Sequence, residues 1–169
     1  MKLSDFDFDL PKSLIAQFPS EKRTDSKLLV AGEGIVDTTF AELGEFLRAG
    51  DLLVLNDTRV IPARLFGQKE SGGRIEILIE RLLSDTQAFA MIKASRAPKI
   101  GSFVVLENGQ RAEVVDKSSG IYTLSFSGTA ILDCLNEVGH VPLPPYIERS
   151  DKEEDLNRYQ TVYAQNDGA

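Results

Sequence analysis

The stretch GDLLVLNDTRVIPARLFG, residues 50–67, joins two different sequence patterns. It begins with Leu52–Leu55, a short apolar run of the kind that forms a buried strand. The run stops abruptly at a polar cluster made of Asn56, Asp57, Thr58 and Arg59. In α/β proteins, ligands bind just beyond the carboxyl ends of buried strands. This stretch therefore indicates both a fold and a candidate binding site.

The residues before this stretch alternate between strand and helix patterns. Lys27–Val30 has strand character, and TFAELGEFLRAG at 39–50 has the apolar spacing of an amphipathic helix. Thr39 and Glu42 have the spacing of a capping box at its start. A helix followed by a buried strand is typical of an α/β layer. We predict an α/β fold, incomplete in this chain, formed by residues 1–62 and 143–169.

After Pro62 the pattern changes to a succession of short strands. In RIEILIERL, at 74–82, the isoleucines share one face and two glutamates lie on the other. Glycine-containing turn signals separate most of these segments, and a short helix is expected at 131–138. Six strands at this spacing predict a small antiparallel β-barrel or sandwich, inserted at 63–142. The expected strands are 64–68, 74–83, 87–94, 102–106, 111–116 and 121–126.

Composition narrows the class of protein. With 26 acidic and 19 basic residues, the 169-residue chain has a net charge of −7, which argues against nonspecific coating of nucleic acid. This charge does not exclude a protein that binds one particular RNA through a local patch of arginines. No apolar run approaches the roughly 18 residues of a membrane span, and MKLSDFDFDL lacks a signal-peptide core. We expect a cytoplasmic protein without membrane contact. Cys134 is expected to pack in a helix, and the single histidine, His140, predicts no metal site.

The polar cluster at 56–59 has two interpretations. Its carboxylate, amide, hydroxyl and guanidinium groups could bind a ribose, a phosphate or a polar amino-acid tail. Alternatively, the cluster forms an Asx turn in which Asp57 pairs with a structural arginine. Arg64 follows five residues after Arg59 and could serve the same cleft, or it could be a surface residue of a strand.

Further candidates lie later in the chain. Arg96, in SRAPK, could contact a phosphate or belong to a solvated hairpin. Tyr146 and Arg149, in LPPYIER, could offer a stacking ring and a cation to an unpaired base, or they could belong to a stiff linker. Arg158 and Tyr159 bring the same residue types to an expected helix, where packing is the alternative.

Taken in order, several motifs resemble those of the S-adenosylmethionine:tRNA ribosyltransferase-isomerases, the enzymes of queuosine biosynthesis. The resemblance spans essentially the whole sequence and involves several long motifs in matching order. They are FDFDLP at 6–11, LIAQFP at 14–19, GDLLVLNDTRVIPARLFG at 50–67, GGRIEILIER at 72–81, SRAPKIG at 95–101, GHVPLPPYIER at 139–149 and DLNRYQTVYA at 155–164.

The resemblance implies an α/β domain that carries an inserted β-barrel. It also implies transfer and isomerisation of the ribosyl group of S-adenosylmethionine onto 7-aminomethyl-7-deazaguanine at the tRNA wobble position. The products would be epoxyqueuosine-tRNA, adenine and methionine. S-adenosylmethionine is then a consumed substrate, no cofactor is expected, and the partner is the tRNA anticodon loop. Family members continue for about as long again, so we expect this chain, a monomer, to be inactive alone.

The resemblance also suggests roles for the candidate residues. A base could remove a ribose hydrogen made acidic by the sulfonium, and an acid could protonate the departing adenine. Asp57 is expected to act as this base or to orient a hydroxyl. Arg59 is the second catalytic candidate and is expected to hold the methionine carboxylate, a tRNA phosphate or Asp57 itself. The remaining candidates, expected to bind substrate, are Asn56, Thr58, Arg64, Arg96, Tyr146, Arg149, Arg158 and Tyr159. The competing hypothesis is a non-catalytic RNA-binding module, which would release no adenine.

Overall fold

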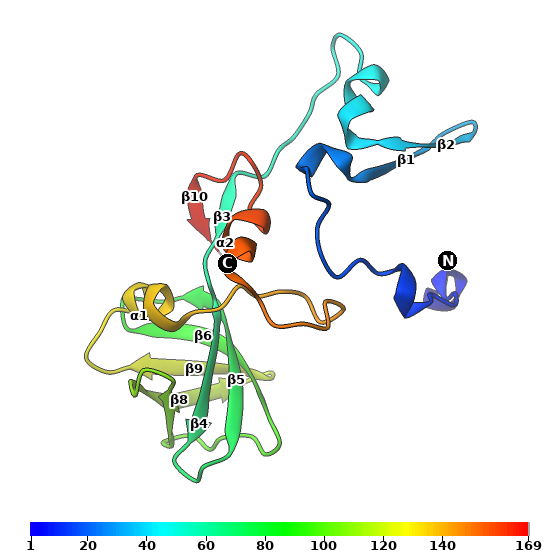
Figure 1. The fold of residues 1–169 in the computed structure, drawn as a ribbon. Coiled ribbons are helices and arrows are strands. Elements are labelled where there is room, and N and C mark those ends of the chain that lie inside the picture. The colour runs from blue at the N-terminus through cyan, green and yellow to red at the C-terminus, as the bar shows by residue number, and fades with distance from the viewer. Residues whose placement is uncertain (169) are drawn as a thin grey trace. The chain divides into compact units, whose positions relative to one another are not determined.

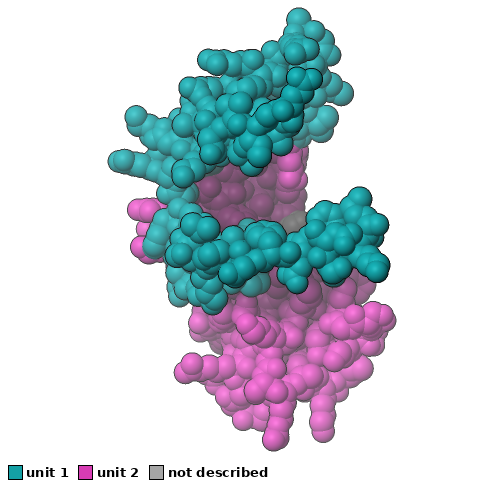
Figure 2. All heavy atoms as spheres, turned by 90° about the vertical axis from the view of Figure 1, so that its right-hand side faces the viewer, with its two compact units in different colours: residues 1–55, 144–150 teal, residues 56–143, 151–169 magenta. Residues whose placement is uncertain are grey.

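The computed structural model describes residues 1–168 and divides into two compact units. The first unit comprises Met1–Leu55 and Pro144–Ser150. The second comprises Asn56–Leu143 together with the segment from Asp151 onward, and Figure 2 shows the two units in different colours. All of the strands predicted for the insert lie in the second unit. None of the helices in the described part of the chain has the length and apolar character that a membrane crossing requires.

A closed six-stranded antiparallel β-barrel forms most of the second unit (Figure 1). All six predicted strands are present, and the barrel rather than the sandwich is confirmed. Around the barrel the strands follow the order β4-β5-β6-β9-β8-β7. Their bounds are β4 Arg64–Lys69, β5 Arg74–Leu82, β6 Gln87–Ala94, β7 Phe103–Leu106, β8 Arg111–Ser118 and β9 Ile121–Phe126.

The barrel interior is filled by alternate residues of each strand. In β5, Ile75, Ile77 and Ile79 are buried while Arg74 and Glu80 are exposed, as the period of two predicts. Small residues such as the buried alanines of β6 leave room for these larger side chains. The closed ring leaves the barrel without a free sheet edge.

Helix α1, Ile131–Val138, is present as predicted from its sequence, and it packs on the barrel. Its Ile131, Cys134 and Leu135 belong to the same buried cluster as the barrel residues. Burial raises the pKa of the Cys134 thiol to about 11, so this thiol stays protonated at neutral pH. The expected packing role of Cys134 is therefore confirmed.

Outside the barrel, the second unit also contains a two-stranded parallel sheet and a second short helix. Strand β3, Thr58–Val60, pairs in parallel with β10, Asn166–Gly168. Helix α2, Glu153–Arg158, precedes β10 along the chain. Parallel pairing of two such short strands brings residues about a hundred positions apart into direct contact.

The first unit contains one hairpin and several short 3-10 helices. Strands β1, Lys27–Ala31, and β2, Ile35–Thr39, pair in antiparallel fashion, which confirms the strand expected at 27–30. The 3-10 helices are Leu3–Phe6, Lys12–Leu14, Arg23–Asp25 and Phe40–Phe46. None of these 3-10 helices has a buried residue.

Two expectations for the first unit are wrong. Leu52–Leu55 is not a buried strand: the four side chains are 88%, 55%, 82% and 50% exposed. No strand within residues 1–168 pairs with this run, and an unpaired strand has no ladder to hold it. The amphipathic α-helix at 39–50 is a seven-residue 3-10 helix, and Thr39 makes no side-chain cap. Its apolar face has no layer to bury it, which removes the main source of helix stability. The fold described is mixed, with a closed barrel and few helices.

Candidate functional site

The polar cluster at 56–59 leads into strand β3 through an Asx turn. The side-chain oxygen of Asn56 accepts a hydrogen bond from the backbone N–H of Thr58 at 2.9 Å. This bond holds the backbone bend by which the chain enters the strand. It leaves the Asp57 side chain exposed at the start of β3.

Asp57 is bound by the segment that follows helix α2. Its backbone carbonyl accepts hydrogen bonds from the N–H groups of Gln165 at 2.7 Å and Asn166 at 3.2 Å. Its carboxylate accepts a third bond from the Asn166 amide at 2.8 Å. The hydroxyl of Thr161 also donates to the Asn56 carbonyl at 3.1 Å. The cluster is thus fixed by residues far along the sequence.

Arg59 pairs with Asp167 on the neighbouring strand β10. The guanidinium makes a two-pronged contact in which Nη2 lies 3.0 Å from Oδ2, while Nε donates to Oδ1. The pKa of the Asp167 carboxyl is lowered by the hydrogen bond from Arg59, and the pKa of Arg59 is raised by the same contact. Both side chains are about half exposed, so an anionic ligand could reach the guanidinium.

Helix α2 is linked to strand β3 by the residue pair Gln160 and Val60. The Gln160 side chain accepts from the Val60 N–H and donates to the Val60 carbonyl, each at 2.8 Å. Tyr159 ends helix α2, and its hydroxyl lies 3.4 Å from the carbonyl of Pro142. Arg158, in the last turn of the same helix, is half-buried. The structure therefore brings 56–59 and the 158–160 segment into one region of the second unit.

Arg64 lies on the outer face of strand β4. Its Nε is 3.1 Å from the carboxylate of Glu76, and its Nη2 donates to the Leu143 carbonyl at 2.7 Å. Its backbone also pairs with His140 through two hydrogen bonds. The side chain therefore ties the barrel to the chain that leaves it. Arg96 lies separately, exposed in the β6–β7 loop.

Tyr146 and Arg149 belong to the first unit, where Gln17 organises them. The Gln17 amide donates to the Tyr146 carbonyl at 3.0 Å, and its backbone carbonyl accepts from Arg149 Nε at 2.7 Å. The Arg149 guanidinium lies over the ring of Phe18, 4.4 Å from its centroid. The Tyr146 side chain is exposed, so its ring is free to stack on a base.

Sequence reasoning missed three residues of the 56–59 region. Asn166 and Asp167 contact Asp57 and Arg59, and Gln160 holds Val60. No periodic pattern marks them, because their position results from parallel pairing between distant segments. Chemically, the region offers a carboxylate, amides and a guanidinium on one short sheet, a set suited to sugar hydroxyls and an anionic group.

Comparison with known proteins agrees with this arrangement of motifs. Residues 3–169 match the family described as queuosine biosynthesis protein. The chain is 59% identical over all 169 residues to the S-adenosylmethionine:tRNA ribosyltransferase-isomerase of Vesicomyosocius okutanii subsp. Calyptogena okutanii, and covers 50% of that protein. It thus spans about half the length of this curated relative.

A solved structure is also similar. This is the S-adenosylmethionine tRNA ribosyltransferase of Thermotoga maritima, at 33% identity and a TM-score of 0.42. The similarity covers 79% of this chain and 48% of that one. Because the family match includes nearly every residue, we conclude that this chain belongs to the queuosine biosynthesis protein family.

Proposed function

We propose that this chain supplies half of an S-adenosylmethionine:tRNA ribosyltransferase-isomerase. The observation that carries the proposal is the 59% identity, over the whole chain, to a relative of that name. The reaction would move the ribosyl group of S-adenosylmethionine to 7-aminomethyl-7-deazaguanine in a tRNA anticodon and rearrange it. Epoxyqueuosine-tRNA would form, and adenine and methionine would leave.

We propose that residues 56–59 form the part of the active site in which the ribose reacts. The exposed Asp57 carboxylate, positioned by Asn166, would accept a proton from the ribose or orient one of its hydroxyls. Arg59 would hold an anionic part of the substrates, with Asp167 fixing its orientation. Asn56 and Thr58 would complete the hydrogen bonds to the sugar.

The other candidates are proposed to bind substrate. Arg64 and Arg96 would bind substrate from the barrel. The guanidinium of Arg64 is already oriented by Glu76. Tyr146 and Arg149 would contact the anticodon loop, as would Arg158 and Tyr159. Their role would be positioning of the tRNA, which brings the modified base to the ribose.

We also propose that residues 1–62 and 143–169 belong to an α/β domain, with 63–142 as the inserted barrel. The support is that the four consecutive apolar side chains of Leu52–Leu55, each at least half exposed, make an unfavourable surface unless further chain covers them. That covering layer would come from the part of the relative that this chain does not match.

Adenine release tests the proposed reaction. The chain would be joined to the unmatched part of the Vesicomyosocius okutanii protein and mixed with S-adenosylmethionine and tRNA that carries the deazaguanine precursor. We expect adenine only with this tRNA, none with unmodified tRNA, and none from the chain alone. A folded chimera that binds the tRNA and releases no adenine would reject the proposal in favour of an RNA-binding module.

Substitution of Asp57 tests the proposed role of its carboxylate. Asp57→Asn retains an oxygen that can accept from Asn166 and removes the base, so adenine release by the chimera should fall by roughly 100-fold or more. Asp116→Asn, on the exposed part of β8, is the matched control and should leave the rate unchanged. A near-normal rate of adenine release by Asp57→Asn would contradict the proposed role of the carboxylate.

A further inference from the structure

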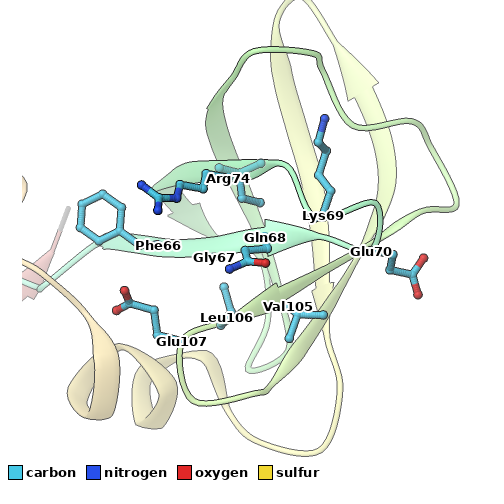
Figure 3. Close-up of a pocket in the computed structure, with 11 residues that line it drawn as sticks. Phe66, Gly67, Gln68, Lys69, Glu70, Arg74, Val105, Leu106 and Glu107 are labelled. Atoms are coloured by element: carbon cyan, nitrogen blue, oxygen red, sulfur yellow. The ribbon is translucent and has the colours of Figure 1, made fainter.

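An open pocket of about 760 Å³ lies on the outer face of the barrel, over strands β5, β4 and β7. Figure 3 shows the residues around it. Those that matter for its chemistry are Phe66, Gln68, Lys69, Arg74 and Glu107. A second depression, of about 500 Å³, shares Phe66 and Arg74 and adds Lys93. None of the residues considered so far as ligands of the reacting ribose lines either depression.

Strand register arranges these side chains in two rows across the barrel surface. Gln68 pairs with Arg74 on one side and with Val105 on the other, so the three outward side chains lie side by side. Phe66 pairs with Glu76, which in turn pairs with Lys93. Phe66 and Lys93 thus lie in one row across β4, β5 and β6, with Glu76 between them.

The ring of Phe66 is held in place by its neighbour His140. The two rings meet edge to face with centroids 4.9 Å apart and planes at 67°. His140 is itself fixed, with Nδ1 2.9 Å from an oxygen of Asp151 and Nε2 3.6 Å from Glu107. A restrained aromatic ring on a solvent-accessible surface loses little entropy when a planar group stacks on it.

Two of the acidic residues at this surface have cationic partners. Glu70 pairs with Arg111, and the carboxylate of Glu76 lies 3.1 Å from Arg64. Glu107 faces His140. The two arginine–glutamate pairs reduce the negative field that would otherwise repel an anion.

The basic residues, in contrast, are largely unpaired. Within residues 1–168, Arg74 and Lys93 form no ion pair with an acid, and both are exposed. Lys69 donates from Nζ to the carbonyl of Arg96 at 2.9 Å, which links the β4–β5 turn to the β6–β7 loop. That loop adds two exposed cations, Arg96 and Lys99. A chain of net charge −7 therefore carries a local positive surface at this end of the barrel.

We propose that this surface binds a single-stranded segment of RNA, with one base stacked on Phe66. Successive phosphates would be contacted by Arg74, by Lys93, and by Lys69 and Arg96, which a hydrogen bond links. The Gln68 amide would hydrogen-bond to the edge of the base. The combination of a fixed ring, an amide and separated cations fits a nucleotide chain better than a free phosphate, which would need only the cations. The inference rests on the proposed function in one respect, because a tRNA would supply the segment.

Fluorescence anisotropy with a labelled RNA stem-loop tests this surface in the 169-residue chain itself. Affinity would be measured over a range of salt concentrations for the wild type and for Arg74→Ala with Lys93→Ala. Loss of two phosphate contacts should make the slope of log K against log salt shallower by about 1.4. Phe66→Leu should weaken binding roughly 5-fold or more, with an unchanged slope. Arg81→Ala, exposed on β5 beside Glu80, is the matched control.

Each outcome decides the proposal. Preference for the stem-loop over a blunt RNA duplex, together with the two expected changes, would support it. An affinity and a salt slope in the double variant equal to those of the wild type would overturn it. Heparin binding by the wild type as strong as its RNA binding, or no RNA binding by the wild type, would also overturn it. The adenine-release assay of the chimera is independent of these variants, so ribosyl transfer can succeed where this surface fails, and the reverse.

Discussion

Replacement of Gly67 by alanine should open the seam that closes the barrel. Gly67 lies on β4 opposite Leu106 of β7, and only three residue pairs join these strands. A Cβ atom at Gly67 would lie closer than 3.0 Å to the backbone carbonyl oxygen of Val105 and 3.2 Å from the Cα of Leu106. Because the obstacle is backbone, the strands must separate by several tenths of an ångström. Overpacking of this kind costs about 1–3 kcal/mol, from which about 0.4–1 kcal/mol of unfolded-state entropy is recovered.

The expected result is a free energy of unfolding lower by about 1–2 kcal/mol, measured by urea denaturation followed by circular dichroism. Gly73→Ala, in the adjoining turn, is the matched control. Its Cβ would meet only the flexible end of Lys69, with Cε at 2.7 Å, so its stability should change by less than about 0.5 kcal/mol. Equal stabilities for the two variants would refute the claim that the backbone of β7 leaves no room for a Cβ atom at Gly67.

Three further results are expected. The pKa of the Cys134 thiol is raised from 9.0 to about 11 by burial, so its contribution to stability is present below pH 9 and is lost as pH rises towards 11. Cys134→Ala should remove this part of the pH dependence in thermal melts. The pKa of the Asp167 carboxyl, which Arg59 lowers, should be found below its ordinary range by NMR titration and should return to that range in Arg59→Ala. The stabilising contribution of this carboxylate is present above its unfolded-state pKa and is lost as the pH falls through the lowered folded-state pKa. Gln160→Ala should speed hydrogen exchange at the Val60 amide by about 5-fold or more, because that N–H loses its acceptor.

The barrel was predictable because its signals are local. Alternation along 74–82 marks β5, glycine-containing turns separate most of the strands, and each strand pairs with at least one strand that is its neighbour in the sequence. The helix at 131–138 was predictable for the same reason, with Gly139 as its end. Closure into a barrel needed the structure, because the β4–β7 and β6–β9 pairings join strands that are not consecutive.

The first unit was predicted less well, for the converse reason. Leu52–Leu55 and the helix pattern at 39–50 require a layer to pack on, and the described residues provide none. Likewise, Asp167 reaches Arg59 only through the parallel pairing of β3 with β10. The position of the cluster 56–59 could be read from the sequence, while the residues that orient it could not.

The most direct test of the proposed ribosyl transfer follows the carbon atoms of S-adenosylmethionine. The chimera would be given S-adenosylmethionine labelled with carbon-13 throughout its ribose, and the nucleosides of the precursor tRNA would be analysed by mass spectrometry. We predict a wobble nucleoside that is heavier by all of the ribose carbons, and no label when the methyl group of S-adenosylmethionine carries it instead. Label from the methyl group, or none from the ribose in a folded chimera that binds both substrates, would contradict the account.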